Sequence, residues 1–423
     1  MTKHKRQVNF ELLRIVAMLM IITLHYLDKG GILPTWIQEV ERPLGGLASG
    51  PELMAMFLEA FCLPAVNVFV LLTGYFSCHN TRSFTSFRRI GGLWFTVIFY
   101  SAAIALLALA SGLTAADDIS VYFVTETLFP VLTNRYWFAT SYLLLMLFAP
   151  FLRRGMEQLS GKEYGILLAA LLGYFSLAKT IVFFYRFPLD SGGYDVLWFM
   201  VLYLLGGYIA RFGLPFAETA GKAAALYAVP ASMIPLLTLA LRYVNLLTGR
   251  FGEVTEYAYT YNHVLCLLSS VGLFSLFRAA GSEAPAGAVV SAAGESADGK
   301  AFAAGKAPGA VVSAAGKSAG SEAFAAGKAL SGTVAPAGDK PHANAEGMPQ
   351  RLVRLFASAV FGVYLIHEHP ALRYVWPRWF HTEDFAGSPL FLFHWILTVP
   401  TIFLVCAGID LLRQKLAGLR ISG

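Results

Sequence analysis

Long apolar runs recur along the whole chain, and they restrict it to one class of fold. A helix of about 20 mostly apolar residues crosses the hydrocarbon core of a bilayer. Of the 423 residues, 57% are hydrophobic and only 14% are charged, which is too little charge to cover a water-facing surface of that size. We therefore predict an all-α, polytopic membrane protein with about ten transmembrane helices, at roughly 10–27, 53–76, 91–112, 135–152, 164–184, 194–212, 222–241, 259–278, 353–373 and 389–412.

The charges between these runs predict how the chain is oriented. Basic residues gather in alternate connections, such as the one that holds Arg82, Arg88 and Arg89, whereas the next connection holds Asp117 and Asp118. Cytoplasmic loops carry the excess of Lys and Arg, so we expect both termini in the cytoplasm and the lipid bilayer as the main partner. The formal net charge of +6 belongs to these loops and does not indicate nucleic-acid binding. No oligomeric state is predicted.

One segment has a different composition, and it divides the chain into three parts. Residues 279–350 are rich in Ala, Gly, Ser and Lys, and the stretch from Gly287 to Pro308 is repeated from Gly309 to Leu330. Each copy offers too few large apolar side chains to offset the entropy of ordering it. We expect a disordered cytoplasmic loop at 279–350, inserted between a membrane core at 1–278 and its remainder at 351–423.

The first apolar run contains two ionisable residues, Arg14 and His25. They are eleven positions apart, so at about 100° per residue they share one helix face, separated by about 16 Å along the axis. An ionisable group at membrane depth is costly unless it faces protein or water. The pair therefore indicates a polar path through the bundle. In the alternative interpretation, Arg14 reaches the headgroups and His25 lies at the opposite interface.

Three further stretches carry candidate binding or catalytic residues. Arg82, Arg88 and Arg89 suit phosphate groups, or they anchor a cytoplasmic loop. The aromatic starts of the runs near Asn134 and Tyr194 suit an interfacial belt, or a sugar-stacking surface. His367 and Glu368 fit an acid–base or substrate-orienting role. His367 and His369 point to different helix faces, so no metal site is expected.

Several of these motifs together resemble the acyltransferase-3 family of integral membrane acyltransferases, which acylate sugars and other cell-envelope molecules. The pattern Arg-x10-His at Arg14–His25 resembles the opening of that family. "TGYF", "YWFATSYLLLMLFAPFL", "LWFMVLYLLGGYIARFG" and "YLIHEHP" are similar to its second, fourth, sixth and penultimate spans. The likeness covers the chain except the repeat loop, and it looks closest to the branch that includes sugar O-acetyltransferases and the membrane half of serine/alanine racemases.

The resemblance implies transfer of an acyl group, usually acetyl, from cytoplasmic acyl-CoA to an acceptor at the outer face of a bacterial inner membrane. His25 matches the family's essential histidine and Arg14 its partner arginine. We hypothesise that His25 is then a general base or an acyl carrier, that Glu368 or a loop carboxylate orients it, and that Arg14 stabilises the thioester oxyanion or the pantetheine arm. The family's Arg-x-x-Arg pair is not reproduced at Arg88 and Arg89.

Two other classes of function fit parts of this pattern. A transporter that exports an envelope lipid or sugar also has many spans with buried polar groups, although no inverted symmetry of broken spans is visible here. A non-catalytic scaffold leaves the shared face of Arg14 and His25 unexplained.

Overall fold

The computed structural model describes residues 7–33, 47–78, 87–185, 187–250, 252–282 and 347–418, and within these ranges it contains helices and no strands. The prediction of an all-α membrane protein is confirmed. The longer helices are α1 (Val8–Asp28), α3 (Gly50–Cys62), α4 (Ala65–Ser77), α5 (Phe87–Ala110), α7 (Trp137–Gln158), α8 (Gly161–Leu172), α10 (Val196–Phe212), α11 (Ala220–Thr248), α12 (Val264–Ser282), α13 (Met348–His367) and α15 (Phe391–Leu416).

Short elements join these helices. They are η1 (Ala116–Asp118), α6 (Val121–Leu128), η2 (Gly173–Ala178), α9 (Lys179–Ile181), η3 (Pro215–Ala217), η4 (Gly252–Val254), η5 (Tyr257–Tyr259), α14 (Val375–Trp379) and η6 (Thr382–Phe385). Two of the breaks lie inside predicted spans. Pro64 separates α3 from α4, and η2 is a π-helical stretch between α8 and α9.

Each of the ten predicted runs coincides with a helix or a helix pair. In the part of the chain that the structure describes, seven are long and apolar enough to cross a bilayer: Val8–Asp28, Gly50–Ser77, Arg89–Ala110, Gly161–Ile181, Ala220–Thr248, Val264–Gly281 and Phe391–Leu416. The helix α10 has 17 residues, and α7 and α13 contain arginine pairs near one end. The count of ten spans and the orientation of the termini remain predictions.

Several helix ends differ from the boundaries expected from apolarity. The helix α7 continues through Pro150 to Gln158 rather than ending near residue 152, because a helix does not stop where its side chains become polar. It ends before Ser160, which starts α8 with a capping box: Ser160 accepts from the Glu163 N–H and Glu163 accepts from the Ser160 N–H. The local cap, rather than the edge of the apolar run, sets this boundary.

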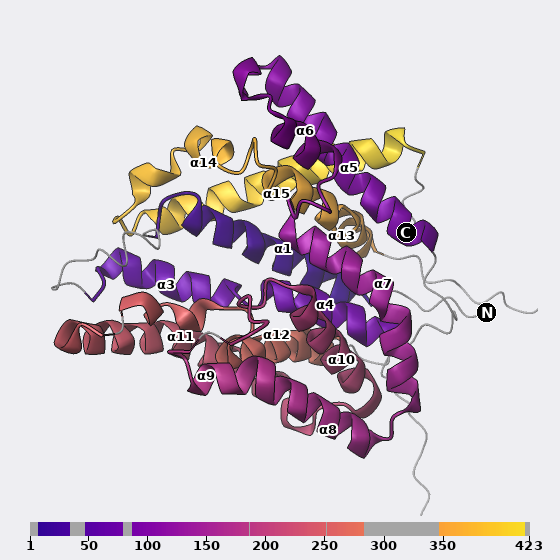
Figure 1. Ribbon diagram of the computed structural model, residues 1–423, viewed down its shortest axis with the longest axis vertical. Helices are drawn as coiled ribbons and strands as arrows, with labels where there is room; N and C mark the ends of the chain where they lie inside the picture. Colours follow the sequence, from indigo (N-terminus) through magenta and orange to yellow (C-terminus); the bar gives the residue numbers. More distant parts are fainter. Residues whose placement is uncertain are drawn as a thin grey trace, which may run out of the picture. The chain divides into compact units, whose positions relative to one another are not determined.

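The first helix, α1, lies among helices from distant parts of the chain. It packs against α3, α4, α12, α13 and α15 (Figure 1). Near its end, Tyr26 donates a hydrogen bond to the carbonyl oxygen of Phe391, at the start of α15. Near its beginning, Asn9 donates to the carbonyl oxygen of Phe277 in α12. The side chains of α1 therefore face protein rather than lipid over much of its length.

Glycines allow α4 and α10 to approach closely. A Cβ atom on Gly74 would overlap the carbonyl oxygen of Tyr203, and one on Gly206 would overlap that of Leu71. Small residues at such crossings let transmembrane helices pack backbone to backbone. The two helices therefore form a rigid pair beside α1.

The helices belong to one compact unit, which consists of residues up to Ala284 and from Gly347 onward. The helix α12 extends to Ser282 and α13 begins at Met348, so the core reaches a few residues into the segment expected to be a loop. Residues 283–346, with the internal repeat, lie outside the described residues. The predicted disorder of 279–350 and its role as a separate part stay predictions.

Candidate active site

His25 on α1 meets two residues from the end of α13. Its Nδ1 atom lies 3.0 Å from Nε2 of His367 and 3.1 Å from a carboxylate oxygen of Glu368. His367 and Glu368 are almost completely buried, whereas 17% of the His25 side chain is exposed. Three of the candidate residues predicted from the sequence thus form one cluster, although His25 and His367 are 342 positions apart along the chain.

The hydrogen bonds of His367 determine which nitrogen of His25 carries a proton. Nδ1 of His367 lies 2.6 Å from the carbonyl oxygen of Val363. A carbonyl oxygen only accepts, so this nitrogen is the protonated one, and Nε2 of neutral His367 presents a lone pair to His25. Glu368 also presents an acceptor. Nδ1 of His25 therefore carries its proton, and Nε2 of His25 is left with a free lone pair.

Two cations hold Glu368 in position. Nζ of Lys29 donates to one of its carboxylate oxygens at 3.0 Å, and a guanidinium nitrogen of Arg373 lies 3.6 Å from the other. Lys29 follows His25 by four residues, so both lie on the same face of α1. A carboxyl group that is buried without partners is costly, and these contacts supply partners to Glu368 and direct it at His25.

Arg14 lies on the same helix but nearer its other end. It forms an ion pair with Glu11 at 2.6 Å, and its guanidinium lies 5.7 Å from the ring centroid of Phe76 on α4. Glu11 is buried and 31% of the Arg14 side chain is exposed. The structure therefore places Arg14 and His25 on one continuous helix, each with its own polar partner.

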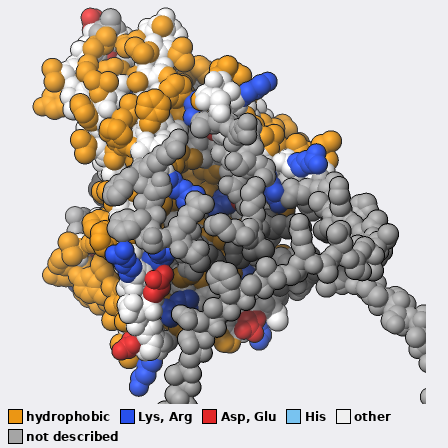
Figure 2. All heavy atoms as spheres, turned by 90° about the vertical axis from the view of Figure 1, so that its right-hand side faces the viewer, with side chains coloured by type: hydrophobic (Ala, Val, Ile, Leu, Met, Phe, Trp, Pro, Cys, Tyr) orange, Lys and Arg blue, Asp and Glu red, His pale blue; other side chains and the backbone are white. Residues whose placement is uncertain are grey.

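The predicted phosphate-binding arginines lie largely outside the described residues. Arg82 is outside them, as is the side chain of Arg88, and Arg89 is exposed near the start of α5. Figure 2 views the side at which α1 begins and α15 ends, and it shows Lys and Arg side chains near the middle of that face with hydrophobic side chains on its flanks. The assignment of this face to the cytoplasmic side stays a prediction from the loop charges.

One possible metal-ligand atom from each of His25, His367 and Glu368 lies within 4.8 Å of the others. This spacing would allow a metal site. Imidazole nitrogens and a carboxylate are suitable ligands for zinc. The charges of Lys29 and Arg373 beside Glu368 oppose a divalent cation, and Nδ1 of His25 is already used as a donor. His369 contributes no ligand here, because its Nε2 atom lies 3.2 Å from the carbonyl oxygen of Ser101 on α5.

Two contacts at the site involve residues that the sequence analysis did not select. Lys29 pairs with Glu368 and Glu11 pairs with Arg14. Both were visible as helical spacing, because Lys29 lies four residues after His25 and Glu11 three residues before Arg14. The role of Lys29 was not predicted, because the first helix was expected to end at residue 27 and Lys29 lay beyond it.

The sequence also matches a known protein family. The model of the acyltransferase-3 family, described as an acyltransferase domain, matches residues 7–297, which is more than half of the chain. The matched region includes Arg14 and His25 and ends before α13, which supplies His367 and Glu368. No curated protein and no solved structure matches the chain.

Proposed function

The chain belongs to the acyltransferase-3 family of membrane acyltransferases, and from this membership and the geometry around His25 we propose the reaction that it catalyses. It moves an acyl group, preferably acetyl, from cytoplasmic acyl-CoA to a hydroxyl of a cell-envelope carbohydrate. The membrane concerned is a bacterial inner membrane. Donor, acceptor and location rest on the resemblance of the motifs.

One observation supports the chemical role of His25 above all others. Nδ1 of His25 faces two acceptors, Nε2 of His367 and the carboxylate of Glu368. This leaves Nε2 of His25 unprotonated, which is the state that a general base needs. The carboxylate stabilises the imidazolium that forms when the base takes a proton, as the aspartate does in a Ser-His-Asp triad.

The proposed step conserves atoms and charge. Nε2 of His25 removes the proton of the acceptor hydroxyl, and the hydroxyl oxygen attacks the carbonyl carbon of the thioester. The carbon–sulfur bond then breaks, and the CoA thiolate takes the proton back from the imidazolium. The products are the O-acyl acceptor and CoA thiol, and His25 is neutral again.

The donor reaches His25 from the end of α1 that carries Arg14. Arg14 is only partly buried and is restrained by Glu11, so its guanidinium is available to contact the pantetheine arm or a phosphate of CoA. We assign the phosphate contacts to Arg82, Arg88 and Arg89, as the basic connection suggests. Positive charge there attracts the donor, which is a polyanion.

A transfer assay tests this function. Membranes that contain the wild-type chain, His25→Ala or the control His381→Ala receive acetyl-CoA labelled in its acetyl group, and label is followed into extracted envelope glycans. The His381 side chain is 76% exposed and pairs with Asp384 rather than with the residues around His25. We expect label with the wild type and the control and none with His25→Ala at equal protein level. Equal labelling with all three would contradict the role of His25.

The same lone pair on His25 allows a second route, in which Nε2 attacks the thioester and forms an acyl-histidine. Rapid quenching in a single turnover separates the two routes. An acetylated peptide containing His25 that forms and decays as product appears would establish the covalent route. Its absence throughout the turnover would establish direct transfer. The transporter alternative gains no support from the family match or from the described contacts.

A further inference from the structure

Three aromatic rings from separate parts of the chain meet at the same place. The ring centroids of Trp137 and Tyr194 are 4.5 Å apart, those of Tyr194 and Tyr261 are 4.7 Å apart, and those of Trp137 and Tyr261 are 5.7 Å apart. Trp137 starts α7, Tyr194 precedes α10 and Tyr261 precedes α12. Tyr194 remains 45% exposed, so the group offers an accessible aromatic surface.

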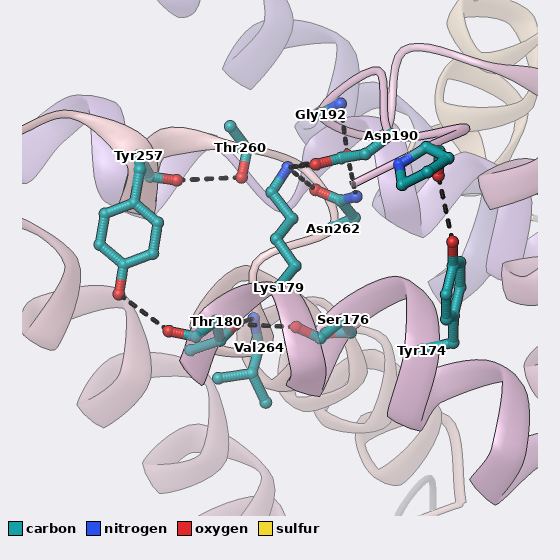
Figure 3. Close-up of polar contacts among 11 residues, drawn as sticks. Tyr174, Ser176, Lys179, Thr180, Asp190, Gly192, Tyr257, Thr260, Asn262 and Val264 are labelled. Atoms are coloured by element: carbon teal, nitrogen blue, oxygen red, sulfur yellow. Dashed lines mark hydrogen bonds and ion pairs between the residues drawn. The ribbon is translucent and has the colours of Figure 1, made fainter. Parts of the chain in front are cut away.

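Polar contacts fix the two segments that carry the tyrosines. Asp190 accepts from Lys179, from the amide of Asn262 and from the Gly192 N–H, each at 2.9 Å (Figure 3). The Tyr261 N–H donates to the carbonyl oxygen of Gly192 at 3.0 Å. The tyrosine rings are thus held by the backbone and do not have to be ordered when a ligand binds.

A chain of ring contacts connects this aromatic group to the His25 cluster. Trp137 contacts Phe138, Phe138 contacts Tyr364 and Tyr364 contacts His367, with centroid distances of 6.0, 5.5 and 6.3 Å. Next to Trp137, the hydroxyl of Tyr136 donates to the carbonyl oxygen of Leu365 at 3.4 Å. The start of α7 and the end of α13 are therefore packed together.

An acidic side chain on a neighbouring helix lies within electrostatic range of the two tyrosines. Glu59 on α3 is partly accessible, and within the described part of the chain its side chain makes no hydrogen bond and no ion pair. It interacts electrostatically with Tyr194, Tyr261 and Asp28, the last of which is on α1 one turn beyond His25. A carboxyl group with no partner among the described residues is satisfied by water or by a polar ligand, which an interfacial belt facing lipid would not supply.

We propose that Trp137, Tyr194 and Tyr261 form the surface on which a sugar ring of the acceptor stacks, and that Glu59 accepts hydrogen bonds from its hydroxyl groups. A sugar presents one apolar face of C–H groups and a rim of hydroxyls; an aromatic surface matches the first and a carboxyl group matches the second. This assignment rests on the proposed function, because it presumes that the acceptor at His25 is a carbohydrate.

Steady-state kinetics with two varied substrates test the assignment. A water-soluble glycan fraction released from the envelope is varied at fixed acetyl-CoA, and acetyl-CoA is varied at fixed glycan. We expect Tyr194→Ala and Glu59→Gln each to raise the KM for glycan about tenfold and to leave the KM for acetyl-CoA unchanged. Tyr194→Phe keeps the ring and should behave as the wild type. Tyr122→Ala, at an 81% exposed tyrosine, is the control.

The outcomes separate this assignment from the proposed function. If transfer depends on His25 but the KM for glycan is unchanged in both Tyr194→Ala and Glu59→Gln, the aromatic surface is not the acceptor site and the function stands. If the wild type transfers nothing to glycan, both are overturned. If Tyr194→Ala does not fold, Glu59→Gln decides alone, since a carboxamide fits the same space.

Discussion

At the scale of single residues, the proposed chemistry of the site depends on one proton, that on Nδ1 of His25. Its two acceptors are the last residue of α13 and the residue that follows it, and each is fixed in turn: His367 by the Val363 carbonyl and Glu368 by Lys29. An imidazole held in this way keeps the same nitrogen free in every molecule. The cluster is therefore organised for proton transfer at Nε2 before any substrate arrives.

Replacing Glu368 by glutamine should separate this role from packing. The amide fills the same space, but it carries no charge to stabilise the imidazolium, and its NH2 group can face Nδ1 and favour the other tautomer. We expect kcat to fall by about 10²- to 10⁴-fold with little change in the KM for acetyl-CoA. Single-turnover transfer in membranes measures this. A kcat within a few-fold of the wild type would remove Glu368 from the mechanism.

At the scale of helices and loops, close packing between helices holds the site, and these contacts leave little room for larger side chains. The pair of α4 and α10 is the clearest case, because Gly74 lies against the backbone of Tyr203. The helix α4 in turn packs against α1, which carries His25. A change at the crossing of α4 and α10 therefore acts on the catalytic helix through packing alone.

Gly74→Ala should destabilise the protein by about 1–3 kcal/mol, because its Cβ would overlap a backbone carbonyl that has no room to move. Gly92→Ala is the matched control, since nothing lies within 4 Å of a Cβ at that position of α5. Thermal unfolding in detergent compares the two. Equal unfolding temperatures for both variants would show that α4 and α10 do not pack as described.

The loop between α9 and α10 gives a pH-dependent prediction. Burial raises the pKa of Asp190, but hydrogen bonds from Lys179, Asn262 and Gly192 outweigh it and hold the pKa below its ordinary value of 3.8. A carboxyl with a lowered folded-state pKa stabilises the fold above its unfolded-state pKa, and this contribution is lost as the pH falls through the folded-state value.

Asp190→Asn should therefore lower the unfolding temperature at neutral pH, and the difference from the wild type should shrink as the pH falls below about 4. The measurement is a series of thermal unfolding curves across this pH range. Asp118→Asn, at an exposed position, controls for the loss of one negative charge. A difference that is the same at every pH would mean that the Asp190 carboxylate is not stabilised by these donors.

At the scale of the whole molecule, the positions of the helices could be predicted from the sequence, but most of the contacts between helices could not. Apolarity alone predicts helices at all ten runs because a helix that crosses lipid must satisfy its backbone internally. The shared face of Arg14 and His25 follows from helical periodicity. The contact of His25 with Glu368 does not, because it depends on α1 packing against α13.

The same limit applies to the aromatic group and to the π-helical stretch. Tyr261 stands in a connection that was expected to be part of a span, and only the fold brings it to Trp137 and Tyr194. The stretch Gly173–Ala178 leads directly into Lys179, which reaches Asp190, and no local sequence signal distinguishes it from an ordinary helix. The aromatic group and the π-helical stretch both depend on contacts between distant parts of the chain.

Transfer of the acyl group across the membrane through His25 is tested most directly in a sealed system. Proteoliposomes would contain labelled acetyl-CoA inside and a soluble envelope glycan outside, with the wild type or His25→Ala at equal amounts, and external label would be measured. We predict labelled glycan outside only with the wild-type protein. Equal labelling with His25→Ala, or labelling only when donor and glycan share one compartment, would contradict the account.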